Sequence, residues 1–275
     1  MTDSVAQRHH ASQEQDPFLT VHGFPVYFQE DWSTGIGGGL WSTGLAIGKY
    51  LQTDHAREQL TRSLSFTRTL HPNQKMTVVE LGSGNGLLSL CWLALTASIL
   101  DRMGTTGVCK NDLDLYVSDV SDHLPLIQQT LRSNQHILER LPGTSVTVVE
   151  HRWGEFDVKL SGDSENQDSS AGVSETESTF GKLQDCKVDV ILGSDLAYRE
   201  ELYDPLIASY KRLANETTVI LLGVTMADTM PSFFDRLHDA GFEYSRLADH
   251  LMDPKFRGQT FGIFLIHKVR RVGRK

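Results

Sequence analysis

The stretch VVELGSGNGLLSL, at residues 78–90, constrains this chain more than any other feature. A short apolar run ends in an acid, passes through three alternating glycines, and gives way to a second apolar run. This pattern is typical of a buried strand that turns through a glycine loop into a helix, with a ligand over the turn. It predicts an α/β fold with a binding site at the carboxyl end of that strand.

The residues of this turn exclude two common phosphate-binding loops. The dinucleotide fingerprint GxGxxG requires a glycine at position 87, where the chain has Leu87. A Walker loop requires Lys and then Ser or Thr after its last glycine, and two leucines follow here instead. A nicotinamide-dependent oxidoreductase is therefore disfavoured. Glu80 also suits a cationic ligand with an α-amino group better than an anionic pyrophosphate.

Two further acids follow apolar runs in the same way as Glu80. Asp119 ends the run DLDLYVSD, and Asp195 ends VDVILGSD. The carboxyl ends of parallel strands meet at one edge of a sheet, and a carboxylate there can accept two ribose hydroxyls. An amino acid, a ribose and a positive charge together describe S-adenosylmethionine. The alternatives are that Glu80 points to solvent and that Asp119 merely caps the next helix.

Strand-like and helix-like stretches alternate along most of the chain, which predicts a mostly parallel, Rossmann-like sheet with helices on both faces. Between residues 248 and 260 we expect a loop, so the last strand should run antiparallel beside its predecessor. We expect Asp204 to cap a helix that begins at Pro205, and a hairpin at 18–30. The expected strands are 76–82, 112–119, 145–154, 188–195, 217–226, 243–248 and 261–269, and the expected helices are 40–51, 86–100, 124–138, 205–214 and 231–241.

Composition organises the chain into one domain with polar appendages. Residues 1–16 and 161–179 have almost no large apolar side chains, so we expect an unstructured N-terminus and an acidic, Ser-rich surface insertion. We expect one domain at 17–270 and a basic tail at 271–275. No secretory core, metal-ligand spacing or span-length apolar run occurs, and a net charge of -9 argues against a broad nucleic-acid surface. We therefore expect a cytoplasmic monomer, with the nucleus as a second location, and no membrane, metal or nucleic-acid partner.

The chain resembles the class I (seven-strand) methyltransferases, and within them the family 16 protein-lysine methyltransferases. The similarity covers about residues 35–213, and the leading LW, the WG after the third strand and the DxxY after the fourth make it specific. The stretches that carry it, in the order found in the family, are GGLWSTGLAIGKYL, VVELGSGNGLLSL, YVSDVSDHLPLIQQTLRSN, EHRWGE and VDVILGSDLAYREELYDPL.

This resemblance implies S-adenosylmethionine as cofactor and assigns residues to it. Trp41 would cover the cofactor, Asp119 would hold its ribose, and Trp153 would pack by the adenine. Ser194, where the family often has alanine, would line the pocket. The amino-acid end of the cofactor would contact Gly82, Ser83 and Gly84.

The chemistry would centre on Asp195 and Tyr198. A lysine amine is protonated at neutral pH and must lose a proton before it accepts a methyl group. Asp195 can accept a hydrogen bond from the incoming ammonium, and Tyr198 offers a ring face and a hydroxyl. The alternative is that Asp195 caps the following turn and Tyr198 packs on its helix.

The predicted function is methyl transfer to a lysine of a protein substrate. The family includes enzymes that modify chaperones, AAA ATPases and translation elongation factors. Alternatives are a protein histidine, an N-terminus or a small amine as acceptor, or a non-catalytic binding protein with this fold. The DNA amino-methylating signature is absent, because SDLAY follows the fourth strand.

Overall fold

A computed structural model of the chain describes residues 16–70, 75–103, 113–155 and 187–269. The predicted insertion at 161–179 and the predicted basic tail at 271–275 lie outside the described residues, as does all but the last residue of the predicted N-terminal segment. Among the residues that are described, no helix is both long and apolar enough to span a membrane.

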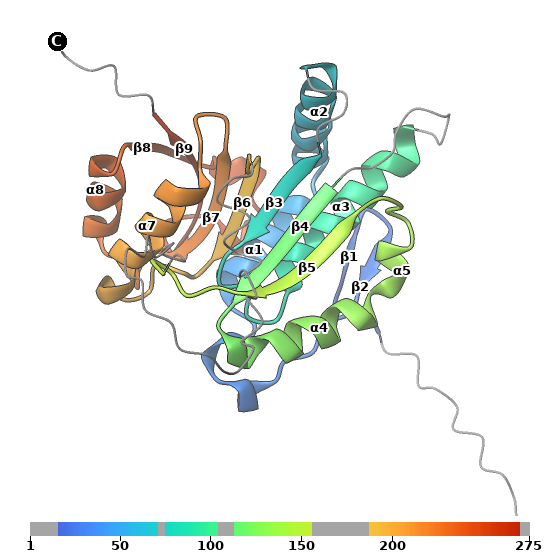
Figure 1. Cartoon of the computed structure of the whole chain (residues 1–275), viewed down its shortest axis with the longest axis horizontal. Coiled ribbons are helices and arrows are strands. Elements are labelled where there is room, and N and C mark those ends of the chain that lie inside the picture. Colours follow the sequence, from blue (N-terminus) through green and yellow to red (C-terminus); the bar gives the residue numbers. More distant parts are fainter. Residues whose placement is uncertain (1–15, 71–74, 104–112, 156–186, 270–275) are drawn as a thin grey trace, which may run out of the picture.

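A seven-stranded sheet forms the centre of the molecule (Figure 1). Its order is β5-β4-β3-β6-β7-β9-β8, in which the first five strands are parallel and β9 runs antiparallel to both of its neighbours. The predicted fold class and the antiparallel last strand are confirmed, with β9 inserted between β7 and β8. The strands are β3 (Met76–Glu80), β4 (Leu113–Asp119), β5 (Ser145–Glu150), β6 (Val190–Ser194), β7 (Val219–Thr225), β8 (Phe242–Arg246) and β9 (Phe261–Lys268).

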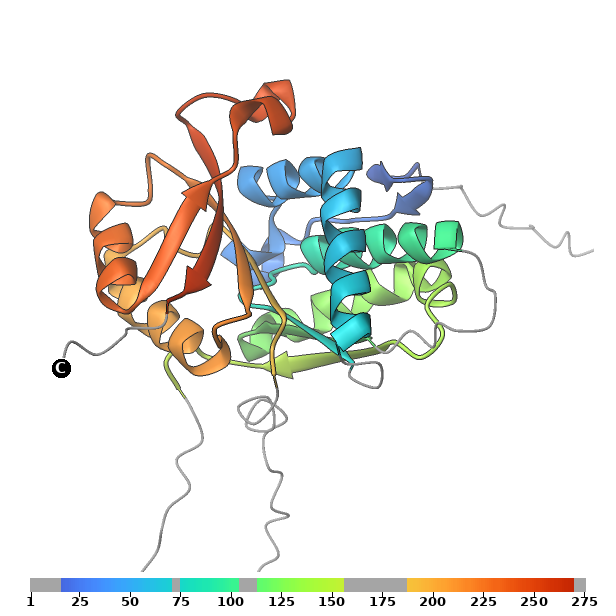
Figure 2. The ribbon, with the colours of Figure 1, turned by 90° about the horizontal axis from the view of Figure 1, so that it is seen from above.

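Helices cover both faces of the sheet, with α1 and α3 on one side and α7 and α8 on the other (Figure 2). Side chains alternate accordingly along the strands: Val78 belongs to the core under α1 and α3, and its neighbour Val79 to the core under α7. Both residues are fully buried, which explains why the strand is a continuous apolar run. The helices are α1 (Ser42–Leu51), α2 (Asp54–Leu70), α3 (Leu87–Met103), α4 (Leu124–Ser133), α5 (Gln135–Leu138), α7 (Tyr203–Leu213) and α8 (Pro231–Asp239).

The hairpin predicted at 18–30 is confirmed as β1 (Leu19–Val21) and β2 (Phe24–Val26). The helix predicted over 124–138 breaks at Asn134, whose side chain pairs with both backbone groups of Tyr27 and thereby fixes the hairpin beside the helix pair. A tertiary contact of this kind leaves no periodic signal in the sequence.

One helix start and one whole helix differ from the prediction. The predicted cap at Asp204 is wrong: α7 begins at Tyr203 after a 3-10 turn at Glu200–Leu202, and no side chain caps it. Asp204 instead pairs with Arg236 on α8. Helix α2 was not predicted because its sequence DHAREQLTRSLSFTRTL is mostly polar, although Ala56, Leu60 and Leu64 follow a helical spacing that could have indicated it.

Candidate active site

A pocket of about 600 Å³ opens where the parallel strands end, on both sides of the point at which the strand order reverses between β3 and β6. This is the usual ligand position in an open α/β sheet, and the volume is typical of small-molecule sites. All ten residues selected from the sequence line this one pocket: Trp41, Glu80, Gly82, Ser83, Gly84, Asp119, Trp153, Ser194, Asp195 and Tyr198.

The glycine turn after β3 depends on backbone conformations that disfavour side chains. Gly82 and Gly84 have φ values of +57° and +60°, in the left-handed region. A Cβ atom on Gly84 would lie 2.4 Å from the backbone oxygen of Gly37, and one on Gly82 would lie 2.7 Å from the Trp153 ring. The hydroxyl of Ser83 between them is buried beside the Glu80 carboxyl, whose pKa it helps to lower. The turn therefore leaves backbone and one hydroxyl open to a closely approaching ligand.

Glu80 is buried at the end of β3, with 2% of its surface exposed. The backbone N–H and the hydroxyl of Ser89, in the first turn of α3, both donate to its Oε2 atom. Burial raises the pKa of Glu80 to about 7, against the lowering effect of these donors. The alternative that Glu80 points to solvent is therefore wrong. A buried carboxyl of this kind gains a charge partner when a cation binds beside it.

Asp119, at the end of β4, is tied to the glycine turn. The N–H of Gly84 donates to its Oδ2 atom at 2.6 Å, and the N–H of Val120 donates to Oδ1 at 2.7 Å. His123 adds a third contact, with Nδ1 2.7 Å from Oδ1. Because a carboxylate oxygen accepts about two hydrogen bonds, Oδ2 keeps one position for a ligand hydroxyl.

Residues 31–41, hereafter the strap, directly precede helix α1 and cover one side of the pocket. The strap contains two 3-10 turns, η1 (Trp32–Thr34) and η2 (Ile36–Gly38), and Gly37 and Gly39 line the pocket. Asn85 in the glycine turn donates from Nδ2 to the Gly39 oxygen at 2.7 Å. Sequence reasoning missed Gly37, Gly39, Asn85 and His123, although the run of glycines at 35–39 was a usable signal.

Trp41 ends the strap at the N-cap position of α1, where it is 40% exposed. Its indole N–H donates to the Ile36 oxygen at 2.9 Å, and its ring meets Trp32 edge to face. These contacts orient the ring while leaving much of it uncovered on the pocket wall. The position suits a ligand that stacks or slides under the indole.

Asp195 directly follows β6 and is strained, with a φ of +53° that non-glycine residues rarely adopt. Thr225 at the end of β7 donates its hydroxyl to Oδ1 at 2.9 Å, and the N–H of Thr43 in α1 donates to Oδ2 at 3.2 Å. The carboxylate thus bridges two elements and does not cap the turn that follows it. Each oxygen retains a free lone-pair direction for an incoming donor.

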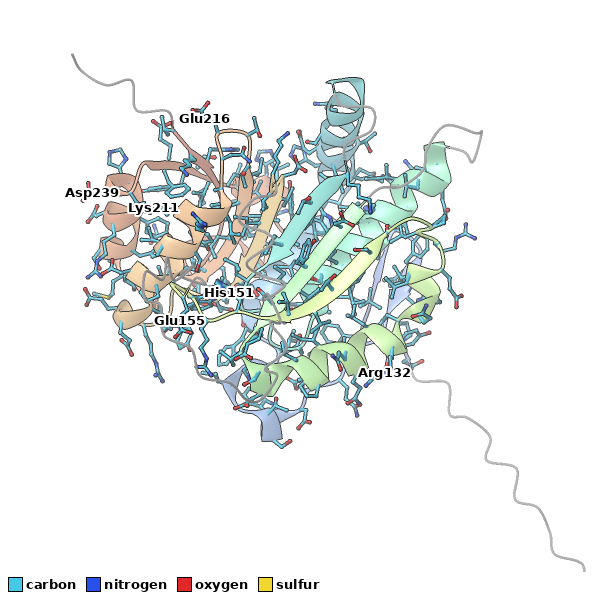
Figure 3. The ribbon with its side chains drawn as sticks, viewed as in Figure 1. Arg132, His151, Glu155, Lys211, Glu216 and Asp239 are labelled. Atoms are coloured by element: carbon cyan, nitrogen blue, oxygen red, sulfur yellow. The ribbon has the colours of Figure 1, made fainter. Side chains whose placement is uncertain are left out.

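The outer wall of the pocket is more open. Tyr198 is half-buried, with the Arg199 guanidinium 5.5 Å from its ring centroid, and Asp228 in the loop after β7 is exposed. His151 and Glu155 lie where β5 ends (Figure 3). Burial lowers the pKa of His151 to about 4, so its ring is neutral near pH 7.

Five carboxylates line the pocket, and Arg152 is the one Lys or Arg among the described residues that do so. Arg152 itself pairs with Glu150. The described ranges of the chain contain no group of His, Cys, Asp and Glu arranged to hold a metal ion. Because acids outnumber basic side chains along its wall, the pocket is suited to cationic ligands. Its acids are Glu80, Asp119, Glu155, Asp195 and Asp228.

Comparisons with known proteins agree with this geometry. A family model described as lysine methyltransferase matches residues 22–168, which is more than half of the chain. The protein-lysine N-methyltransferase EFM6 of Saccharomyces cerevisiae is 26% identical over 174 residues, covering 63% of this chain and 56% of the yeast protein. The match thus spans little more than half the length of that relative.

The solved structures that align with this chain include two methyltransferases. The CurJ carbon methyltransferase aligns over 87% of this chain and 61% of its own, with 11% identity and a TM-score of 0.47. The glycopeptide N-methyltransferase MtfA, solved with S-adenosylmethionine, aligns over 77% and 93%, with 12% identity and a TM-score of 0.43.

Proposed function

The chain belongs to the lysine methyltransferase family, and from that premise we propose that it transfers a methyl group from S-adenosylmethionine to a lysine side chain of a protein. One observation carries the proposal: five carboxylates line the same pocket as a glycine turn in the left-handed conformation. Both the sulfonium donor and the lysine acceptor are cations, so this wall attracts both reactants.

The described residues fit this donor. Glu80 offers a buried carboxyl for an α-amino group, and Ser83 offers a buried hydroxyl beside it. The ribose assignment of Asp119 is supported by its Oδ2 atom, which accepts one backbone N–H and keeps one further acceptor position. Trp41 and Trp153 provide apolar surfaces on the same pocket. In this proposal Gly82, Gly84 and Ser194 give the room that the donor needs.

When bound, S-adenosylmethionine supplies a methyl group on a positively charged sulfur, which leaves as a neutral thioether. The contribution of the protein is then to orient the acceptor amine and remove water from it. The lysine arrives protonated, with a reference pKa near ~10.4, and must lose its proton before attack. Asp195 accepts a hydrogen bond from the ammonium through its free lone pairs and then takes up its proton, and the Tyr198 ring borders the amine.

The substrate and setting are part of the same proposal. The similarity to a yeast protein-lysine N-methyltransferase supports a protein lysine as acceptor. We place the protein in the cytoplasm, with the nucleus as a second location, as a monomer that acts on a chaperone, an AAA ATPase or a translation elongation factor.

Purified protein should be incubated with isotope-labelled S-adenosylmethionine and cell extract, and labelled proteins should be mapped by tandem mass spectrometry. We expect label on lysine side chains of one or a few proteins, and none with an Asp195→Asn variant that still binds S-adenosylhomocysteine. Label on histidine, on an N-terminus or on a small amine would replace lysine as the acceptor. Donor binding without transfer to any extract would contradict the proposed activity.

A further inference from the structure

His123 connects the strap to the carboxylate that we assign to the ribose. It lies in the 3-10 turn η3 (Ser121–His123), directly after β4, with 8% of its surface exposed. Nδ1 is 2.7 Å from Asp119 Oδ1, and Nε2 is 3.0 Å from the backbone oxygen of Thr34 in the strap. A single imidazole therefore spans the distance between the floor and the cover of the pocket.

Gly37 of the strap lies directly against this ring. A Cβ atom on Gly37 would be 2.5 Å from His123 Cε1, so that position can hold no side chain. Other bonds that fix the strap are internal to it, such as Asp31 N to Gly38 O, or involve residues next to it in the sequence, such as Leu40 N to Glu30 Oε1. Among the described residues, the side chains from the far side of the pocket that hydrogen-bond the strap are His123 and Asn85.

The two partners of His123 determine its charge. A carboxylate and a backbone carbonyl are both acceptors only, and a neutral imidazole can donate through just one nitrogen. Both contacts are hydrogen bonds only when the ring carries two protons. The pKa of His123 is raised, chiefly by the hydrogen bond to Asp119. The charged groups that face it are Asp119 from β4 and Asp122 from η3, and the strap contributes only the Thr34 carbonyl.

We propose that the doubly protonated His123 is a positioning residue that holds the strap closed against Asp119, so that strap order and donor binding weaken together when the ring loses a proton. This inference rests on the proposed function insofar as the ligand under the strap is S-adenosylmethionine. The device is a feature of this chain, built from an imidazole, a carboxylate and a glycine-lined backbone segment.

The sign of the pH effect follows from the raised pKa. The contribution of the charged ring is complete at acidic pH and is lost as pH rises through the pKa of His123 in the folded protein. A hydrogen bond to a charged group typically changes an equilibrium by about tenfold or more. We expect His123→Gln, which has no charge at any pH, to bind donor about tenfold more weakly near pH 6.5.

Calorimetric titration with S-adenosylhomocysteine between about pH 6 and 9 tests the coupling. The ratio of wild-type to His123→Gln affinity should be largest at low pH and approach one at high pH. Other titrating groups act on both proteins and cancel in this ratio. His136→Gln is the matched control, because His136 also bonds a backbone carbonyl, that of Pro25, but lies away from the pocket. Its ratio should stay near one throughout.

Hydrogen exchange at one fixed pH below 7 gives a second readout that needs no donor. Amides of residues 31–38 should exchange faster in His123→Gln than in the wild type and unchanged in His136→Gln. If the glutamine variant unfolds, His123→Phe, which keeps a planar ring but has no polar atom, replaces it.

An affinity ratio that stays constant with pH, or unaltered exchange over the strap, would overturn the role of His123. Absence of S-adenosylhomocysteine binding by the wild type would instead remove the donor assignment, and the exchange result would still decide whether His123 holds the strap.

Discussion

The two sides of the pocket are built differently. On the donor side, Glu80 and Asp119 are 2% and 8% exposed, and backbone N–H groups hold both carboxylates. On the acceptor side, Tyr198 is half-buried and Asp228 is exposed. The family model covers residues 22–168, so it includes Glu80 and Asp119 but ends before Asp195.

This difference teaches where the chemistry is general and where it is particular. Buried, multiply bonded groups can hold one ligand in one position. Exposed loop residues carry few constraints and can differ between members with different protein substrates. Changes on the donor side should therefore affect binding and stability together, and changes on the acceptor side should affect turnover or substrate affinity alone.

The largest separation is expected from Asp195→Asn. Turnover should fall by roughly a hundredfold or more, because the amide cannot take a proton and offers no negative charge to the acceptor ammonium. Affinity for S-adenosylhomocysteine should stay within about threefold, by calorimetry. Asp189→Asn is the control: Asp189 precedes β6 at the opposite edge and accepts from Thr77 N at 2.9 Å. Equal turnover in both variants would remove Asp195 from the mechanism.

A smaller but still large effect is expected from Gly84→Ala. The new methyl group would meet the Gly37 oxygen at 2.4 Å in a left-handed backbone, so the strap must move. Donor affinity should fall by at least about tenfold. Gly23→Ala has a similar positive φ with nothing within 4 Å of the new atom, and should cost only modest stability. If the two variants bind donor equally, the strap does not form part of the donor site.

Glu80→Gln should change both stability and donor binding, in opposite directions. Because burial raises the pKa of Glu80 to about 7, the ionised carboxyl costs the folded protein stability above that pH. The penalty is full above pH ~7 and disappears as pH falls toward the unfolded value near ~4.5. The variant should therefore be more stable than the wild type by about 2 kcal/mol at pH 8 and nearly equal at pH 5, in denaturant titrations.

The same variant should bind S-adenosylmethionine several-fold more weakly at pH 8, because it lacks the charge for the α-amino group. Wild-type affinity should also decline below about pH 7, as the carboxyl takes up a proton that binding must release. A less stable Glu80→Gln at pH 8 with undiminished affinity would show that the carboxylate is structural.

The smallest effect is expected from Asp228→Asn on the exposed rim. Loss of one solvent-screened charge should raise the KM for the protein acceptor about two- to threefold, with the difference shrinking at high salt. Donor affinity should be unchanged. Asp235→Asn, an exposed acid on α8 away from the pocket, is the control. An altered donor affinity in Asp228→Asn would assign this residue to the donor side of the pocket.

The sequence was informative where local pattern and chemistry coincide. The strand, glycine turn and helix around Glu80 were predictable, because a left-handed turn demands glycine and a buried strand demands a continuous apolar run. The ten residues chosen from such patterns all line the pocket. Their roles stay predictions.

What the sequence did not reveal depends on contacts between distant segments. The bond of His123 to Thr34 joins residues 89 positions apart, and the bond of Thr43 to Asp195 joins residues 152 apart. No spacing rule links such pairs. Helix α2 was missed for a different reason: its sequence is mostly polar, although its few apolar residues, among them the buried Ala56 and Leu60, keep a helical spacing.

Calorimetric titration of the purified protein with S-adenosylmethionine, with NAD as competitor, is the most direct measurement of the central claim. The account predicts one saturable site per chain, displaced by S-adenosylhomocysteine, indifferent to NAD and lost in Asp119→Ala. A protein that retains its melting transition yet takes up no S-adenosylmethionine, or that binds NAD in its place, would contradict it.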